Sequence, residues 1–97
     1  MSLSFSPAAR RQVLAADSWW RRHRAASPEL FTDEVEATVS RVLDAPRVGR
    51  LYGDVAAGAV RRVLMPATRY HVYCQVTDAT LTVLAVWSAR RGRTPPL

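Results

Sequence analysis

The chain has 97 residues, of which 48% are hydrophobic and 23% are charged. A chain of this length buries one modest core, and this composition is ordinary for a folded protein, so several domains and intrinsic disorder are not expected. The net charge is +6. No signal-peptide pattern and no apolar run near the roughly 20 residues of a membrane span occur, so we expect a cytosolic protein.

The N-terminal residues predict a strand followed by two helices. Residues 2–5, "SLSF", alternate serine with apolar residues, as a short strand does. Ser6-Pro7 and Ser27-Pro28 each place a preferred N-cap residue before a proline, which suits the first helical position. Glu29 would then lie in the first turn of the second helix, near the positive end of its dipole.

Apolar residues recur at helical spacing in both segments. In the first helix the stripe consists of Ala9, Val13, Ala16 and Trp20. In the second helix it consists of Phe31, Val35, Val39, Val42 and Leu43. The short link predicts an antiparallel helical hairpin. Trp19 and Trp20 are neighbours, so we expect Trp20 in the core and Trp19 partly exposed.

Residues 44–58 contain one proline and three glycines and are interpreted as a connecting loop. Three strands are predicted at 59–65, 69–76 and 81–87, joined by hairpin-sized links. The last strand is apolar at nearly every position, which is typical of an interior strand covered on both sides. We expect one domain over 1–97, with 89–97 as a flexible tail.

The predicted fold is therefore α+β, in the order β-α-α-β-β-β. A helical hairpin packs on one face of a small, mostly antiparallel sheet and leaves the opposite face partly uncovered. In the strand 69–76, alternation places Arg69, His71, Tyr73 and Gln75 together on one face. Cys74 lies on the other face, where a small buried hydrophobe is expected rather than a nucleophile.

The positive charge lies in the second half of the chain. Residues 1–44 hold six arginines and six acids, whereas residues 45–97 hold eight arginines and two acids. All fourteen basic residues are arginine, which binds phosphate or carboxylate through a planar fork. This pattern favours a polyanionic partner, either nucleic acid, an acidic peptide or an anionic surface. A solvated basic surface, and arginine usage set by genome base composition, remain alternatives.

Six short motifs in this order resemble the RelE/ParE superfamily of bacterial toxins, from type II toxin–antitoxin systems. They are the N-terminal strand, the pair Trp19-Trp20, the turn Pro46-x-x-Gly49-Arg50, the pair Arg61-Arg62, the run Tyr70-His71-Val72-Tyr73, and the tail pair Arg90-Arg91. The resemblance covers almost the whole chain and implies a β-α-α-β-β-β toxin fold.

Three positions depart from the family pattern. His71 stands where arginine is usual, Ser88 where many members have histidine, and the tail "RRGRTPPL" lacks the tyrosine or histidine of the RNA-cleaving members. These departures favour the ParE branch, whose members inhibit DNA gyrase by binding it without proton chemistry.

The resemblance also implies a RelE-like alternative, a ribosome-dependent mRNA endoribonuclease. In that case His71 would act as base or acid, Tyr73 would stack on a base, and three arginines would stabilise the phosphorane: Arg62, Arg69 and Arg91. Otherwise His71 is a surface histidine hydrogen-bonded to a neighbouring strand. A third alternative is an inactive toxin fold that retains only antitoxin binding.

Either toxin class implies a cognate antitoxin whose acidic, flexible C-terminal segment wraps the toxin. The expected contact residues for antitoxin or target are Trp19, Arg61, Arg62, Arg69, His71, Tyr73, Arg90 and Arg91. The resemblance implies no cofactor and no metal, with DNA gyrase or the ribosome and its mRNA as the target.

Overall fold

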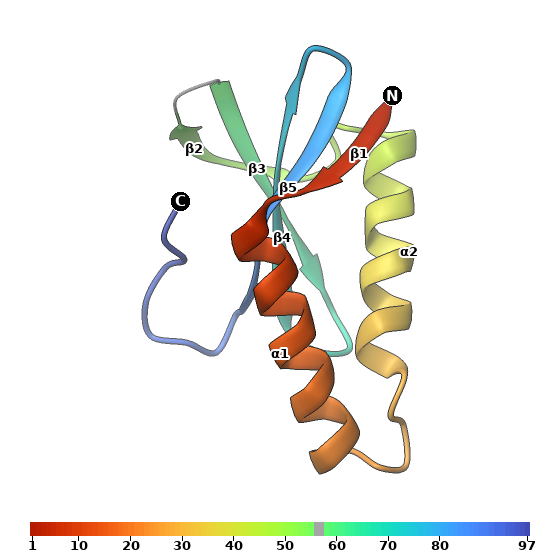
Figure 1. Ribbon diagram of the computed structural model, residues 1–97. Helices are drawn as coiled ribbons and strands as arrows, with labels where there is room; N and C mark the ends of the chain where they lie inside the picture. Colours follow the sequence, from red (N-terminus) through yellow and green to blue (C-terminus); the bar gives the residue numbers. More distant parts are fainter. Residues whose placement is uncertain (56–57) are drawn as a thin grey trace.

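The computed structural model describes residues 1–55 and 58–97, and within these ranges two helices pack against a five-stranded sheet (Figure 1). The elements are β1 (Ser2–Phe5), α1 (Pro7–His23), α2 (Leu30–Asp44), β2 (Arg50–Val55), β3 (Gly58–Met65), β4 (Tyr70–Thr77) and β5 (Thr80–Ser88). The predicted α+β class is confirmed, with β2 as an additional strand. Neither described helix has the length and apolar character needed to cross a membrane.

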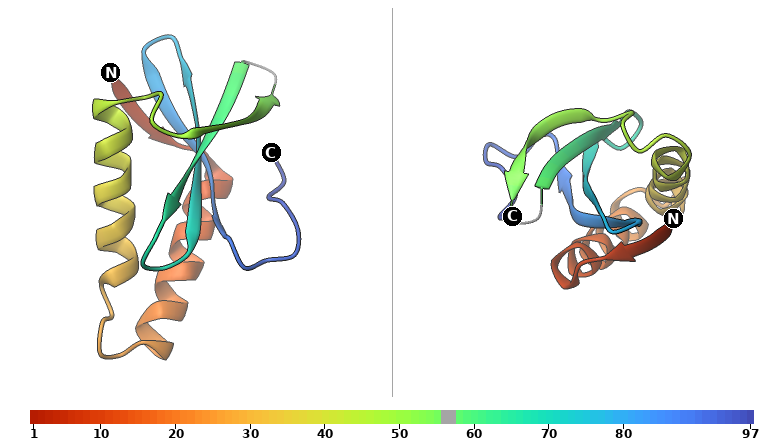
Figure 2. Two further views of the ribbon diagram at one scale, coloured as in Figure 1. Left: turned by 180° about the vertical axis from the view of Figure 1, so that it is seen from behind. Right: turned by 90° about the horizontal axis from the view of Figure 1, so that it is seen from above.

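The sheet has the strand order β1-β5-β4-β3-β2. The pairs from β2 to β5 are antiparallel, as the predicted meander requires, whereas β1 pairs in parallel with β5 through Leu3 and Leu81. Strand β5 is an interior strand, as its apolar sequence predicts. Helix α2 and the C-terminal tail lie on opposite sides of the sheet (Figure 2).

The two serine–proline pairs behave differently. Ser6 caps α1, because its Oγ accepts the Ala9 N–H at 3.0 Å and Pro7 opens the helix. The same prediction for Ser27-Pro28 is wrong, because α2 begins at Leu30 with Glu29 at the N-cap position and no side-chain cap. The backbone N–H of Ser27 donates to the Arg24 carbonyl, so this pair lies in the turn between the helices.

Strand β2 lies in the segment predicted to be a loop, so that prediction is wrong for Arg50–Val55. The strand pairs with β3 in a register that sets Arg50 opposite Arg62. The register shifts between Leu51 and Gly53, so this glycine marks an irregularity within a strand rather than a break between elements. The predicted-loop residues 56 and 57 lie outside the described residues.

The main core lies between the helices and the sheet. Helix α1 buries Ala9, Ala16 and Trp20, and α2 buries Phe31, Val35, Thr38, Val39 and Val42. Most of them pack against residues from three strands, Met65, Val72, Val83 and Val86, whereas Val42 packs on Val63, Cys74 and Leu81. Trp20 is 9% exposed and Trp19 is 40% exposed, as the sequence predicts.

The carboxylate of Glu34 joins α2 to the turn between β3 and β4. It accepts the backbone N–H groups of Ala67 at 2.8 Å and Thr68 at 2.9 Å, and also the Thr68 hydroxyl at 2.6 Å. Arg69 ends this turn with a φ of 64°. The prediction that Arg69 begins the strand is therefore wrong, because this left-handed backbone conformation is incompatible with a regular strand, and β4 begins at Tyr70.

Candidate functional site

The alternation predicted for β4 positions the candidate residues. Val72 belongs to the core beneath the helices, whereas Tyr73 packs with residues on the opposite side of the sheet, here called the outer face. Strand β3 sets Arg62 opposite Tyr73 and Leu64 opposite His71. Three of the predicted residues therefore lie on the outer face together: Arg62, His71 and Tyr73.

The outer face is partly covered by an apolar cluster of its own. Val60, Tyr73, Ala85 and Trp87 are buried there, with Tyr52 and Leu84 packed against them. Tyr73 is only 2% exposed, and its ring contacts Tyr52 edge-on with the centroids 4.9 Å apart. The ring face of Tyr73 is therefore not open to a nucleic-acid base, in contrast to the stacking role expected of it.

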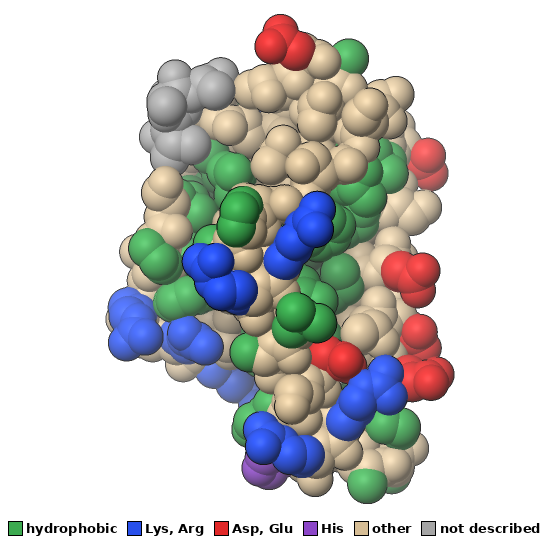
Figure 3. All heavy atoms as spheres, viewed as in Figure 1, with side chains coloured by type: hydrophobic (Ala, Val, Ile, Leu, Met, Phe, Trp, Pro, Cys, Tyr) green, Lys and Arg blue, Asp and Glu red, His purple; other side chains and the backbone are tan. Residues whose placement is uncertain are grey.

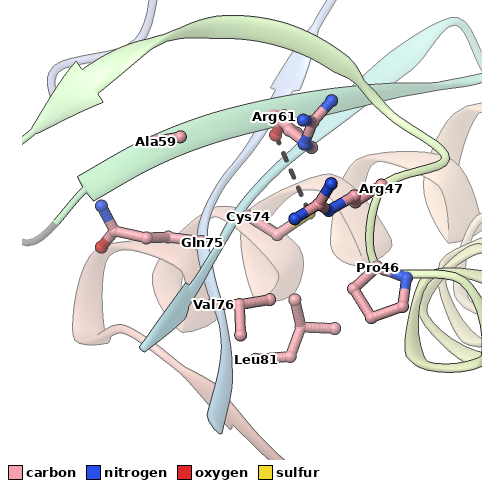
Figure 4. A pocket seen from close by; sticks show the side chains of 8 residues that line it. All are labelled: Pro46, Arg47, Ala59, Arg61, Cys74, Gln75, Val76 and Leu81. Carbon is pink, nitrogen blue, oxygen red and sulfur yellow. Dashed lines mark hydrogen bonds between the residues drawn. The ribbon is translucent and has the colours of Figure 1, made fainter. Parts of the chain in front are cut away.

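A cavity of about 410 Å³ lies on the helix side of the sheet, and Arg61 lines it together with Arg47 (Figure 4). The Nη1 of Arg61 donates to the Gly49 carbonyl at 3.0 Å. Consecutive strand residues point to opposite faces, so Arg61 faces this cavity whereas Arg62 lies on the outer face. Burial raises the pKa of the Cys74 thiol to about 11, so Cys74 is a protonated, buried side chain at this cavity.

The outer face retains a hollow of about 250 Å³ beside the apolar cluster. The residues that line this outer-face hollow include Arg62, His71, Tyr73, Trp87, Arg91 and Arg93. Four of them are residues that the sequence singled out, drawn from β3, β4 and the tail. No aspartate or glutamate of the described chain lines the hollow, so its guanidinium groups are not neutralised from within.

His71 is neutral in this setting. Partial burial lowers the pKa of its imidazole below the usual value of 6.5, and the positive charges of Arg62 and Arg69 lower it further. The His71 and Tyr73 rings are 6.0 Å apart, centroid to centroid. Arg69 is exposed in its turn, outside the outer-face hollow, and acts on His71 through its charge.

Trp87 and Arg93 also line the outer-face hollow, although the sequence did not single them out. The indole N–H of Trp87 donates to the Arg93 carbonyl at 3.0 Å. The guanidinium carbon of Arg93 lies 5.8 Å from the centroid of the Trp87 ring, within reach of a cation–π contact. An outward tryptophan at the end of a strand, followed by arginines, is the signal that could have revealed this arrangement. The flexibility expected of residues 89–97 remains a prediction.

The remaining candidates lie near the C-terminal end of α1, where the chain turns toward α2 (Figure 1). Trp19 stacks on His23 with the ring centroids 4.5 Å apart, and Arg90 and Arg91 line a pocket beside it. The predicted residues therefore form separate groups, which meet at Arg91. No group of three or more His, Cys, Asp or Glu side chains that could hold a metal ion occurs in the described ranges.

Acidic side chains gather on one side of the molecule. Most of the acidic side chains visible in Figure 3 lie along the side formed by α2, and arginines occupy other parts of this view. Helix α2 itself carries four acids and one arginine. Thirteen of the fourteen arginines lie outside α2, in the sheet, the turns, the tail and α1.

Together, a helical hairpin on one side of a small mixed sheet and an arginine-lined hollow on the other define a RelE/ParE-like toxin fold. A family model described as the ParE toxin of the type II toxin–antitoxin system parDE matches residues 3–93. The chain therefore belongs to the ParE toxin family. A search of curated proteins finds no match to this chain.

Two solved structures share the fold. A chain of the chromosomal ParDE toxin–antitoxin system from P. aeruginosa matches with a TM-score of 0.64 and 18% sequence identity, covering 93% of this chain and 97% of that chain. A chain of the intact E. coli RelBE toxin–antitoxin complex matches with a TM-score of 0.59 and 21% identity, covering 93% and 98% respectively. At these identities the likeness establishes the fold.

Proposed function

We propose that this protein is a cytoplasmic toxin that acts in the ParE manner, by binding DNA gyrase and inhibiting it. The observation that carries the proposal is the outer-face hollow, which presents Arg62, Arg91 and Arg93 with no described acid among its lining residues. Such a surface is suited to bind a negatively charged partner by shape and charge. Binding of this kind needs no cofactor and no metal.

The chemistry of the outer-face hollow is poorly suited to RNA cleavage. General acid–base catalysis needs one group that takes a proton and another that gives one. His71 is neutral and can serve as a base, but no described carboxylate lines the hollow, and the Tyr73 hydroxyl belongs to a residue that is 2% exposed. A base without an accessible acid supports binding over catalysis.

A RelE-like ribosome-dependent endoribonuclease is the second candidate. One observation favours it, because Arg62, His71 and Arg91 meet at one hollow as that chemistry requires. The substitution His71→Gln separates the two candidates. Toxicity is lost in His71→Gln if the imidazole moves a proton and is kept if the outer-face hollow only binds its target.

The proposed partner is a cognate antitoxin. We expect a neighbouring reading frame of about 60 to 100 residues, with a DNA-binding N-terminal part and an acidic, flexible C-terminal part that covers the basic groups. A gene that stands alone, with no such neighbour, would argue against the toxin proposal.

The experiment is induction of the chain in a bacterium, with and without the neighbouring gene product. Growth arrest that the neighbour relieves, together with inhibited supercoiling by purified gyrase, is the expected result. Arrest with cleaved ribosome-bound mRNA and unaffected gyrase would replace the proposal with the endoribonuclease. No arrest, with a stable complex between the two products, would identify an inactive fold that retains antitoxin binding.

A further inference from the structure

A pocket of about 580 Å³ lies between the end of α1, the β3–β4 turn and the start of the tail. It is here called the hairpin pocket, and its walls include Trp19, Trp20, Arg24, Thr68, Arg90 and Arg91. It is lined by a different set of residues from the outer-face hollow, with Arg91 and Ser88 common to both. The target-binding role proposed above makes no use of its other residues.

Trp20, a residue that lines the hairpin pocket, leaves one of its polar atoms unpaired. Its indole Nε1 is buried and has no hydrogen-bond partner among the described residues. Trp87 shows the contrast, since its indole N–H donates to the Arg93 carbonyl at 3.0 Å. Buried polar groups in folded proteins are almost always paired, so the unpaired indole N–H of this pocket-lining residue is a candidate donor to a bound ligand.

The hairpin pocket is also positively charged. Arg24, Arg90 and Arg91 line it, and no aspartate or glutamate of the described chain does. Glu34 bonds Thr68 in the pocket wall but does not line the pocket, and its two oxygens accept three hydrogen bonds from the β3–β4 turn. Tyr70 also lines the hairpin pocket, and burial raises the pKa of its hydroxyl above the usual value of 10.

We propose that the hairpin pocket binds a carboxylate side chain of the antitoxin's acidic C-terminal segment, which accepts a hydrogen bond from the Trp20 indole and pairs with Arg90 and Arg24. This inference rests on the proposed function, because it names the place where the proposed partner docks. An apolar residue next to that carboxylate in the antitoxin segment would pack against the rings of Trp19 and Trp20.

A peptide fits the pocket better than RNA does. RNA bases are commonly held by stacking on an aromatic ring. Trp19 is the exposed ring here, and its face is already stacked on His23, with the two ring planes at 14°. A base could stack on that face only by displacing His23, whereas a carboxylate needs only the indole N–H and the guanidinium groups.

The wild-type protein can be tested through its three tryptophans. Each indole N–H gives a separate signal in a proton–nitrogen correlation spectrum, and the variants Trp19→Phe and Trp87→Phe assign them. The probes are the full-length product of the neighbouring reading frame and peptides from its acidic C-terminal part. We expect the Trp20 indole signal to move downfield on binding, as it gains an acceptor.

Two matched variants then measure the contribution of charge. Arg90→Ala removes a guanidinium group that lines the hairpin pocket. Arg22→Ala removes an exposed guanidinium group at the C-terminal end of α1 that does not line the pocket. We expect Arg90→Ala to weaken antitoxin binding by about 10- to 100-fold, as loss of a hydrogen bond to a charged group does. Arg22→Ala should leave the affinity within a factor of about 2, since exposed charges contribute little.

The outcomes separate this inference from the proposed function. A tight complex in which the Trp20 signal stays in place and Arg90→Ala binds normally would overturn the hairpin pocket as the docking site while leaving the toxin proposal standing. Failure of the two products to form any complex would overturn both. A shift of the Trp20 signal by a single-stranded oligoribonucleotide, and not by the acidic peptides, would replace the carboxylate with RNA.

Discussion

The guanidinium carbon of Arg91 lies 4.2 Å from the centroid of the Trp87 ring, so the tail begins with a contact to the end of β5. Trp87→Phe keeps an aromatic ring but removes the N–H that bonds Arg93. We expect faster amide hydrogen exchange in residues 89–97 and a loss of about 1 kcal/mol in unfolding free energy. Trp19→Phe is the control, and equal exchange in both variants would mean that Trp87 does not hold the tail.

Glu34 should be one of the most sensitive polar positions of the fold. Glu34→Ala leaves the N–H groups of Ala67 and Thr68 and the Thr68 hydroxyl without their acceptor. We expect a loss of about 2–3 kcal/mol in urea unfolding, as for hydrogen bonds to a charged group. Glu36→Ala, an exposed acid on the same helix, should change stability by less than about 0.5 kcal/mol. Similar effects at both positions would refute this assignment.

Gly49 is placed where no side chain fits. A Cβ added there would lie 2.9 Å from Val63 Cγ2 and 3.0 Å from the Arg62 carbonyl oxygen. We expect Gly49→Ala to cost about 1–3 kcal/mol and to disturb the bond from Arg61 to the Gly49 carbonyl. Gly92→Ala meets no atom within 4 Å and should be close to neutral in thermal unfolding.

His71 should make folding sensitive to acid. Its folded pKa is depressed below 6.5 by burial and by Arg62 and Arg69, so the unfolded chain binds the proton more tightly. The histidine therefore contributes its full stability above pH 6.5, and that contribution is lost as the pH falls below 6.5 toward the folded pKa. In denaturant unfolding, His71→Gln should lose stability less steeply below pH 6.5 than the unsubstituted protein; identical slopes would contradict this account.

Arg62 on the outer face and Arg69 in the adjacent turn provide a functional test of the basic surface. The double substitution Arg62→Ala/Arg69→Ala should abolish toxicity while costing no more than about 1 kcal/mol of stability, the size of one exposed cation–π contact of Arg62 with Tyr52. A variant with Arg22→Ala/Arg47→Ala loses the same charge elsewhere and should stay toxic in a growth assay. Unfolding of the first variant would show that these arginines support the fold.

Local patterns predicted most of this fold because they depend on short stretches of chain. The Ser6-Pro7 cap, the two apolar stripes and the alternation through His71 and Tyr73 follow from local geometry, and the structure bears them out. Ser27-Pro28 has the same local signal, but these residues form the short turn that joins the two helices. The helix α2 therefore begins only at Leu30.

The features of the fold and site that the sequence did not predict depend on contacts between residues far apart in the chain. Strand β2 forms because β3 supplies its hydrogen-bond partners. The glycines of this segment, taken alone, predict a loop. The bonds from Glu34 to the β3–β4 turn span more than thirty residues, and no motif marks them. For the candidate site, the sequence named Arg62, His71 and Arg91, but the packing of the tail on Trp87 decides that they share one hollow.

The parallel pairing of β1 with β5 joins the beginning of the chain to its last strand. The Ser6 hydroxyl donates to the Leu84 carbonyl, and the Gln12 side chain accepts the Val86 N–H, so both contacts span more than seventy residues. During translation, β1 consequently lacks its strand partner, and Ser6 and Gln12 lack these hydrogen-bond partners, until the ribosome has added β5. The five-stranded sheet of this chain therefore cannot be completed until β5 has been synthesised.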